Sequence, residues 1–121
     1  MPNNKYANGA AFERKIIKAL LEDVHCPFVI RGAGSKSYGS IKADIAAISP
    51  NGKMILVQAK NSDIKYEKEK EDFYNNIYNL NLKLSEDGTD VIIGLWTTPK
   101  TLKKDIEKLN IMILFSIFEK L

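Results

Sequence analysis

The sequence has few of the features on which disulfide scaffolds, membrane proteins and exported proteins depend. Cys26 is the only cysteine among the 121 residues, so no internal disulfide can form. No run of about 18 or more apolar residues occurs, so the sequence predicts no transmembrane helix. The N-terminus is polar and lacks the apolar centre of a signal peptide. We therefore expect a cytoplasmic protein with no membrane partner.

The length and composition are those of one globular domain. A hydrophobic content of 45% and a charged content of 27% are ordinary, so neither disorder nor a fibrous class is indicated. The net charge of +3 is unevenly distributed. Residues 1–66 carry ten Lys or Arg against five Asp or Glu, whereas residues 67–121 carry eight against ten. A basic first half suggests an anionic polymer such as nucleic acid, although lysines that only maintain solubility would give the same count.

The order of the expected elements predicts a single mixed α/β domain over residues 1–121, with a central mixed β-sheet flanked by helices. A glycine- and serine-rich loop is expected over 32–40, and a solvated helix face over the charged run 65–76. The apolar segment 111–118 is expected to be a buried edge strand or a dimer interface. The full series is a flexible arm over 1–9, a helix over 10–23, strands over 26–31, 43–49 and 53–60, a helix over 66–84, a strand over 90–97, a helix over 101–109 and a strand or short helix over 111–118.

The turn "PNG" sets the register of the central hairpin. Pro50 and Asn51 suit the middle of a type I turn, and Gly52 suits the left-handed position that follows. This three-residue loop would pair Ser49 with Lys53 and place Asp44 opposite Gln58. A two-residue Asn-Gly loop would shift the register by one and turn Asp44 to the other face.

In the first register, Asp44, Gln58 and Lys60 share one face of the hairpin, and Glu13 on the first helix can reach them. Carboxylate and amide oxygens suit Mg²⁺, which can activate water, and a lysine can stabilise charge on phosphate. Each residue also has a structural interpretation. Glu13 could favour the helix N-terminus, Asp44 could protect a strand edge, and Lys60 could oppose aggregation.

This pattern resembles the PD-(D/E)xK nuclease motif, with Asp44 followed by "QAK" ending at Lys60. Together with Gly9, Glu13 and Arg14, then Arg31 and Ser35, then "ADIAAI" and "VQAK", it is similar to the Holliday junction resolvases of archaea and archaeal viruses. The resemblance covers roughly residues 8–66.

The resemblance implies a restriction-endonuclease-like domain and a metal-dependent endonuclease that cuts four-way DNA junctions as a homodimer. Glu13, Asp44 and Gln58 would hold Mg²⁺, for which Mn²⁺ could substitute, and Lys60 and Ser35 would belong to the catalytic centre. The DNA contacts would come from Arg14 and Arg31, to which the basic loop residues Lys36 and Lys42 add. If the protein is viral, its compartment would be the host cytoplasm.

Gln58 departs from the family, which usually has Glu at this position. Glutamine keeps an oxygen for a metal but lacks the negative charge, so we expect weaker metal binding. Two alternatives remain open: a nuclease-like module that binds DNA without cutting it, and a repair or restriction-type nuclease acting on duplex DNA.

Overall fold

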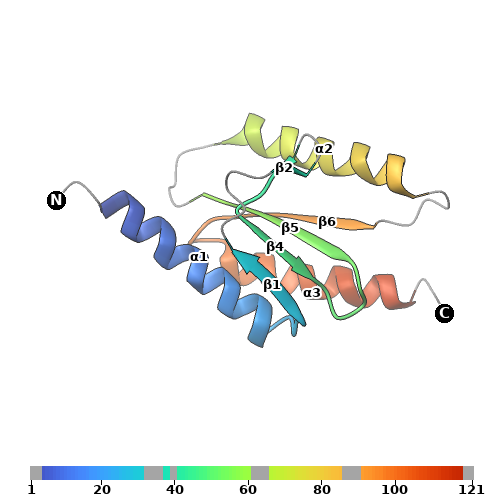
Figure 1. Ribbon diagram of the computed structural model, residues 1–121, viewed down its shortest axis with the longest axis horizontal. Coiled ribbons are helices and arrows are strands. Elements are labelled where there is room, and N and C mark those ends of the chain that lie inside the picture. Colours follow the sequence, from blue (N-terminus) through green and yellow to red (C-terminus); the bar gives the residue numbers. More distant parts are fainter. Residues whose placement is uncertain (1–3, 32–36, 39–40, 61–65, 86–90, 119–121) are drawn as a thin grey trace.

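The computed structural model describes residues 4–31, 37–38, 41–60, 66–85 and 91–118 (Figure 1). These ranges contain three helices and six strands. They are α1 (Asn4–Glu22), β1 (Phe28–Arg31), β2 (Ser37–Tyr38), β3 (Ile41–Lys42), β4 (Ile45–Ile48), β5 (Met54–Ala59), α2 (Glu67–Leu84), β6 (Ile92–Thr97) and α3 (Leu102–Phe118).

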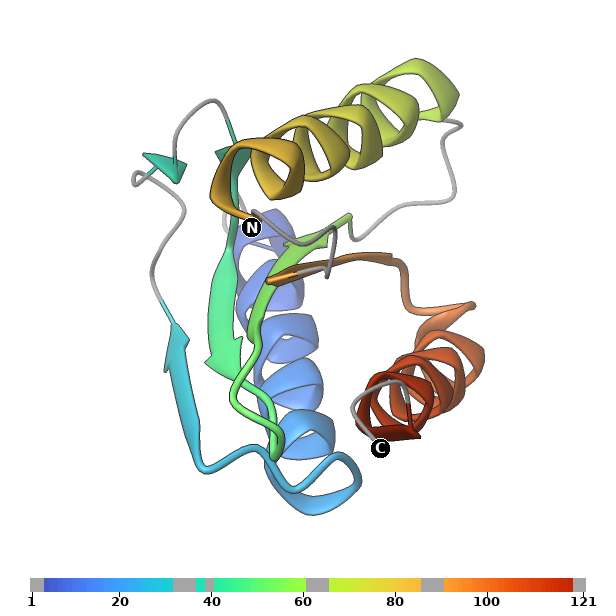
Figure 2. The ribbon, with the colours of Figure 1, turned by 90° about the vertical axis from the view of Figure 1, so that its right-hand side faces the viewer.

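The fold is a three-layer α/β domain, as the sequence predicts. Four strands form one sheet in the order β1-β4-β5-β6, and β2 and β3 form a separate two-stranded ribbon. The β1-β4 and β4-β5 pairs are antiparallel, whereas β5 and β6 are parallel because α2 connects them as a crossover. Helix α2 covers one face of the sheet, and α1 and α3 cover the other (Figure 2). None of the helices in the described ranges has the length and apolarity that a membrane crossing needs.

Alternation along the strands builds a separate core on each face of the sheet. The core shared with α1 and α3 takes Ile45, Ala47, Ile55, Val57, Ile93 and Leu95 from the strands. The core beneath α2 takes Ala46, Leu56, Ile92 and Trp96, together with Phe73 and Ile77 of the helix. Odd-numbered residues of β5 therefore face α1 and α3, and even-numbered residues face α2.

Two expectations about the ends of the chain are wrong. Helix α1 already includes residues 4–9, where a flexible arm was expected. Three alanines, Ala7, Ala10 and Ala11, lie within two residues of Gly9, and one glycine lowers helix stability without ending a helix. Residues 111–118, expected as a separate strand or short helix, are helical but continue α3 instead of forming an element of their own. Leu109 and Ile113 extend the buried stripe of Leu102 and Ile106 at spacings of three and four residues, and no Gly or Pro interrupts it.

The register predicted for the central hairpin is confirmed from the turn to the pair of Ile45 with Val57, whereas Asp44, predicted opposite Gln58, lies beyond the paired residues. Ile48 pairs with Met54, and Ile45 pairs with Val57. At the turn, the amide of Ser49 donates to the carbonyl of Lys53 at 2.8 Å, and the amide of Gly52 donates to the carbonyl of Ser49 at 2.9 Å. Gly52 has φ 85°, the left-handed conformation that the three-residue loop requires.

Candidate functional site

Asp44 lies where the two strands of the central hairpin begin to separate. Its amide donates to the carbonyl of Val57 at 2.9 Å, although Val57 already pairs with Ile45. Two consecutive residues thus oppose one, the arrangement of a β-bulge. The half-buried Asp44 side chain accepts a hydrogen bond from the amide of Ala59, with Oδ2 at 2.9 Å from the nitrogen. The carboxylate therefore contacts the residue between Gln58 and Lys60.

Gln58 and Lys60 extend from the opposite strand toward α2. Both line a pocket of about 310 Å³ between the sheet and that helix. The floor of the pocket is apolar, formed by Ile41, Phe73 and Trp96, and the helix contributes the polar side chains of Glu69, Asp72 and Asn76. The amide and the ammonium of the "QAK" motif thus share a pocket with two carboxylates.

Lys60 makes four contacts within this part of the fold, three through its ammonium and one through its backbone amide. Its ammonium lies 3.4 Å from Glu69 Oε2. The same nitrogen lies 4.8 Å from the ring centroid of Tyr66 and 5.6 Å from that of Trp96, both within cation–π range. The Lys60 amide donates to the carbonyl of Thr97 at 3.0 Å, which anchors the backbone to β6. The lysine is therefore held on the α2 side of the sheet.

Glu13 belongs to α1, which covers the other face of the sheet (Figure 2). Its Oε2 lies 3.6 Å from Arg31 Nη2, so a predicted metal ligand and a predicted DNA contact pair with each other. This ion pair joins α1 to the edge strand β1. Arg14, the other predicted DNA contact on α1, is exposed.

Three predicted site residues have side chains outside the described part of the structure. Ser35 and Lys36 lie outside the described residues. Lys42 belongs to β3, but its side chain is likewise outside the described part of the structure.

The side chains of the predicted metal site come from three elements. Gln58 on β5 faces the α2 pocket, and Glu13 on α1 pairs with Arg31. Asp44 directly precedes β4 and contacts the amide of Ala59. Oxygen donors of this kind suit Mg²⁺. Within the described ranges, no three His, Cys, Asp or Glu side chains form a group that could hold a metal ion, and the amide of Gln58 is a donor of a different kind.

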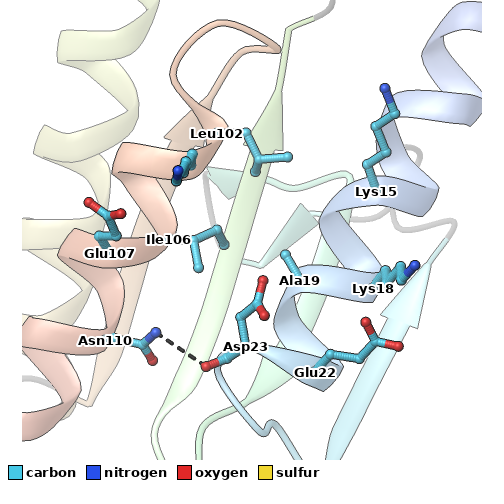
Figure 3. A pocket seen from close by; sticks show the side chains of 10 residues that line it. Lys15, Lys18, Ala19, Glu22, Asp23, Leu102, Ile106, Glu107 and Asn110 are labelled. Carbon is cyan, nitrogen blue, oxygen red and sulfur yellow. Dashed lines mark hydrogen bonds between the residues drawn. The ribbon is translucent and has the colours of Figure 1, made fainter.

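A larger groove of about 520 Å³ lies between α1 and α3, away from these residues (Figure 3). Ala19, Leu102 and Ile106 supply apolar surface, and Asn110 donates from Nδ2 to the carbonyl of Asp23 at 3.3 Å. Its charged residues balance, with Lys15, Lys18 and Lys103 against Glu22, Asp23 and Glu107. A balanced rim gives little attraction for phosphate, so this groove is a poor candidate for a nucleic-acid interface.

Sequence reasoning missed the contribution of α2 to the site. The charged run 65–76 was expected to be a solvated face, yet Glu69, Asp72 and Asn76 line the pocket with Gln58 and Lys60. Their spacing of three and four residues places them on one side of a helix, together with the buried Phe73. That spacing predicts that the three side chains share one helix face. It does not predict that this face packs near Lys60.

The sequence matches no protein-family model, and comparisons with curated proteins and with solved structures find no match either.

Proposed function

We propose that this protein is a metal-dependent endonuclease that cuts four-way DNA junctions by hydrolysing phosphodiester bonds. The observation that carries the proposal is the contact of the Asp44 carboxylate with the amide of Ala59. This hydrogen bond holds the Asp44 carboxylate at the end of the hairpin. Gln58 and Lys60 are the two neighbours of Ala59 on the other strand. A carboxylate, an amide oxygen and an ammonium at one sheet end are the groups that such a reaction uses.

Glu13, Asp44 and Gln58 are the residues that would hold Mg²⁺ or Mn²⁺. Asp44 Oδ2 accepts from Ala59, and a carboxylate has a second oxygen with free lone pairs. Glu13 would exchange its partly exposed contact with Arg31 for the metal, and such contacts contribute little free energy. The metal, when bound, supplies an activated water and positive charge beside the phosphate.

Lys60 would stabilise the negative charge that develops on the phosphate oxygens, acting as a point charge. Water attacks phosphorus and releases a proton to solvent, the bond from phosphorus to the leaving sugar oxygen breaks, and that oxygen takes up a proton from solvent. Arg14 and Arg31 are exposed cations that would contact neighbouring phosphates.

A homodimer is part of the proposal because a junction needs two symmetric nicks and a two-fold dimer presents two equivalent sites. The second half of α3 supports self-association. Ile111, Met112, Leu114 and Phe115 are between 47% and 64% exposed, and Ile113 between them is buried. A helix that is apolar on all sides is normally covered on all sides, which here requires a second surface.

The test is cleavage of a labelled synthetic four-way junction with Mg²⁺, with Mn²⁺ and with EDTA. We expect cleavage only with metal and its loss in Asp44→Asn, whose junction affinity should be retained. Asparagine keeps a side-chain oxygen for the Ala59 amide and removes only the charge, so the hairpin end should be preserved. Asp23→Asn, an exposed acid of the α1–α3 groove, is the matched control. Cleavage that persists in EDTA would refute the proposal.

A DNA-binding module that does not cut is the second candidate. Two observations favour it: Gln58 carries no charge, and Glu13 is already bound to Arg31. It predicts salt-sensitive junction binding with no cleavage under any metal. A nuclease acting on ordinary duplex DNA is separated from both by competing linear duplex against the junction in the same assay.

A further inference from the structure

Lys60 is surrounded on three sides by groups of two different kinds. Tyr66 and Trp96 present rings at 4.8 Å and 5.6 Å from its ammonium, and Glu69 presents a carboxylate oxygen at 3.4 Å. The two rings lie 6.3 Å apart between centroids and are tilted by 55° to each other, so they form adjoining walls. Neither the rings nor Glu69 belongs to the motif that suggested a catalytic lysine.

The aromatic walls are fixed by the fold. Trp96 is 7% exposed, and its ring packs edge-on against Phe73 at 5.9 Å. Tyr66 directly precedes α2 and packs against the same core. Because the Lys60 amide is also bonded to Thr97, both the base of the lysine side chain and the walls around its tip are held in place.

Glu69 is held much less firmly. The Glu69 side chain is 59% exposed, against 27% for the side chain of Lys60. An ion pair that is so accessible to water is weak, and its partners exchange readily. A phosphate oxygen can therefore take the position of the Glu69 carboxylate without disturbing the rings. The ammonium would stay against its aromatic walls while its counter-ion changes.

We propose that Tyr66 and Trp96 are positioning residues for Lys60, and that Glu69 is a resting counter-ion which a phosphate of the DNA replaces. This inference rests on the proposed function, since it assigns roles around a lysine that acts on phosphate. The geometry carries it: rigid rings restrict where the ammonium can be, and the exposed acid occupies the open side.

The first experiment measures the single-turnover cleavage rate and the junction affinity separately. Tyr66→Leu keeps an apolar side chain but removes the ring, so the rate should fall by between about 10- and 100-fold with affinity unchanged, as for a misplaced catalytic group. Tyr66→Phe keeps the ring and should cut at close to the wild-type rate. Tyr78→Leu is the matched control, because Tyr78 is an exposed tyrosine elsewhere on α2.

The second experiment tests the counter-ion. Glu69→Gln should bind the junction about two- to fivefold more tightly, since it removes a weak competitor for the ammonium. Glu71→Gln removes the same charge from an exposed position of α2 and should have a smaller effect. Equal effects of the two substitutions would mean that Glu69 acts only through net charge and would overturn its role.

The third measurement does not depend on cleavage. Ring currents from Tyr66 and Trp96 should shift the NMR signals of the Lys60 ε-methylene upfield in the free protein. The shift should persist in Tyr66→Phe and decrease in Tyr66→Leu. Unshifted signals in the wild type, or a Tyr66→Leu rate equal to that of Tyr78→Leu, would refute the positioning role while leaving the nuclease intact. A wild type that shows the shift but cuts no junction refutes the proposed function, and the catalytic role of the rings with it.

Discussion

The side chain of Asn81 binds both backbone polar groups of Ile92. Its Nδ2 donates to the Ile92 carbonyl at 2.8 Å, and its Oδ1 accepts from the Ile92 amide at 2.8 Å. The same oxygen also accepts from the Val91 amide at 2.9 Å. Asn81 is only 6% exposed, so a buried amide of α2 takes the place of a neighbouring strand at the start of β6.

A second contact of this kind lies further along β6. The amide of Trp96 donates to the Tyr74 hydroxyl at 3.0 Å. Since β6 is the last strand of the sheet, both contacts use backbone groups that face away from β5. Helix α2 therefore protects an edge that could otherwise pair with another chain.

Replacing Asn81 with Leu should strongly destabilise the fold. The change removes three hydrogen bonds and leaves backbone groups of β6 without partners, which should lower the free energy of unfolding by about 2–4 kcal/mol. Urea denaturation followed by circular dichroism measures it. Asn79→Leu, at an exposed position of the same helix, should change stability by less than about 0.5 kcal/mol. Equal losses in the two variants would contradict the role of Asn81.

Two glycines should respond to alanine in opposite directions. A Cβ atom at Gly94 would lie 2.7 Å from Cγ1 of Ile77 and 3.0 Å from Cε2 of Phe73, so Gly94→Ala should destabilise by about 1–3 kcal/mol. A Cβ atom at Gly9 meets nothing within 4 Å in α1, so Gly9→Ala should stabilise by roughly 0.5–1 kcal/mol. Thermal unfolding of both variants checks the signs. A destabilised Gly9→Ala would mean that residues 4–9 are not helical in solution.

Cys26 should make the protein less stable at alkaline pH. Burial raises the pKa of the Cys26 thiol to about 11. The unfolded thiol ionises at lower pH than the folded one, so the contribution is complete below about pH 8.5 and is lost as the pH rises toward 11. The free energy of unfolding should fall less steeply over this interval in Cys26→Ala than in the wild type. In the native protein, alkylation of the thiol at pH 8.5 should be far slower than in urea.

Gln58→Glu tests how far the missing charge limits metal binding. A carboxylate adds a unit of negative charge beside Asp44, so junction cleavage should reach half its maximum at a Mg²⁺ concentration about tenfold lower. Asn76→Asp adds the same charge within the same pocket and is the control for a general electrostatic effect. An unchanged Mg²⁺ requirement in Gln58→Glu would indicate that residue 58 is not a ligand.

The exposed end of α3 should determine the oligomeric state. The double variant Leu114→Lys with Phe115→Lys places two charges on the apolar surface and should shift the proposed dimer to monomer in sedimentation equilibrium. Tyr78→Lys, on an exposed part of α2, should leave the dimer intact. A wild type that is monomeric at all concentrations would contradict self-association through this surface.

Most of the fold could be predicted because local patterns and tertiary packing agree. The alternating strands and the "PNG" turn determined the hairpin register, since each requires the same pairing. The end of α3 was harder to assign. A short apolar run such as 111–118 has no periodicity that distinguishes a strand from a helix, and only its continuation of the buried stripe from Ile106 decides the matter.

The candidate site was only partly predictable. Strand alternation correctly put Gln58 and Lys60 on one face, but it could not show that a bulge redirects Asp44 toward the Ala59 amide. Strand alternation also could not show that Glu13 forms an ion pair with Arg31. Such contacts depend on how separate elements approach one another, and sequence spacing within one element contains no information about that approach.

The turn formed by Pro50, Asn51 and Gly52 has a consequence for how this chain can vary in length. Pro50 and Gly52 are exposed, and exposed turns normally accept insertions and deletions readily. Here one added or lost residue would slide β4 along β5 and exchange the two faces of one strand. Asp44 would then no longer meet the amide of Ala59. This short surface loop should therefore be among the least tolerant places in the molecule for a change in length, even though its side chains contribute little to either core.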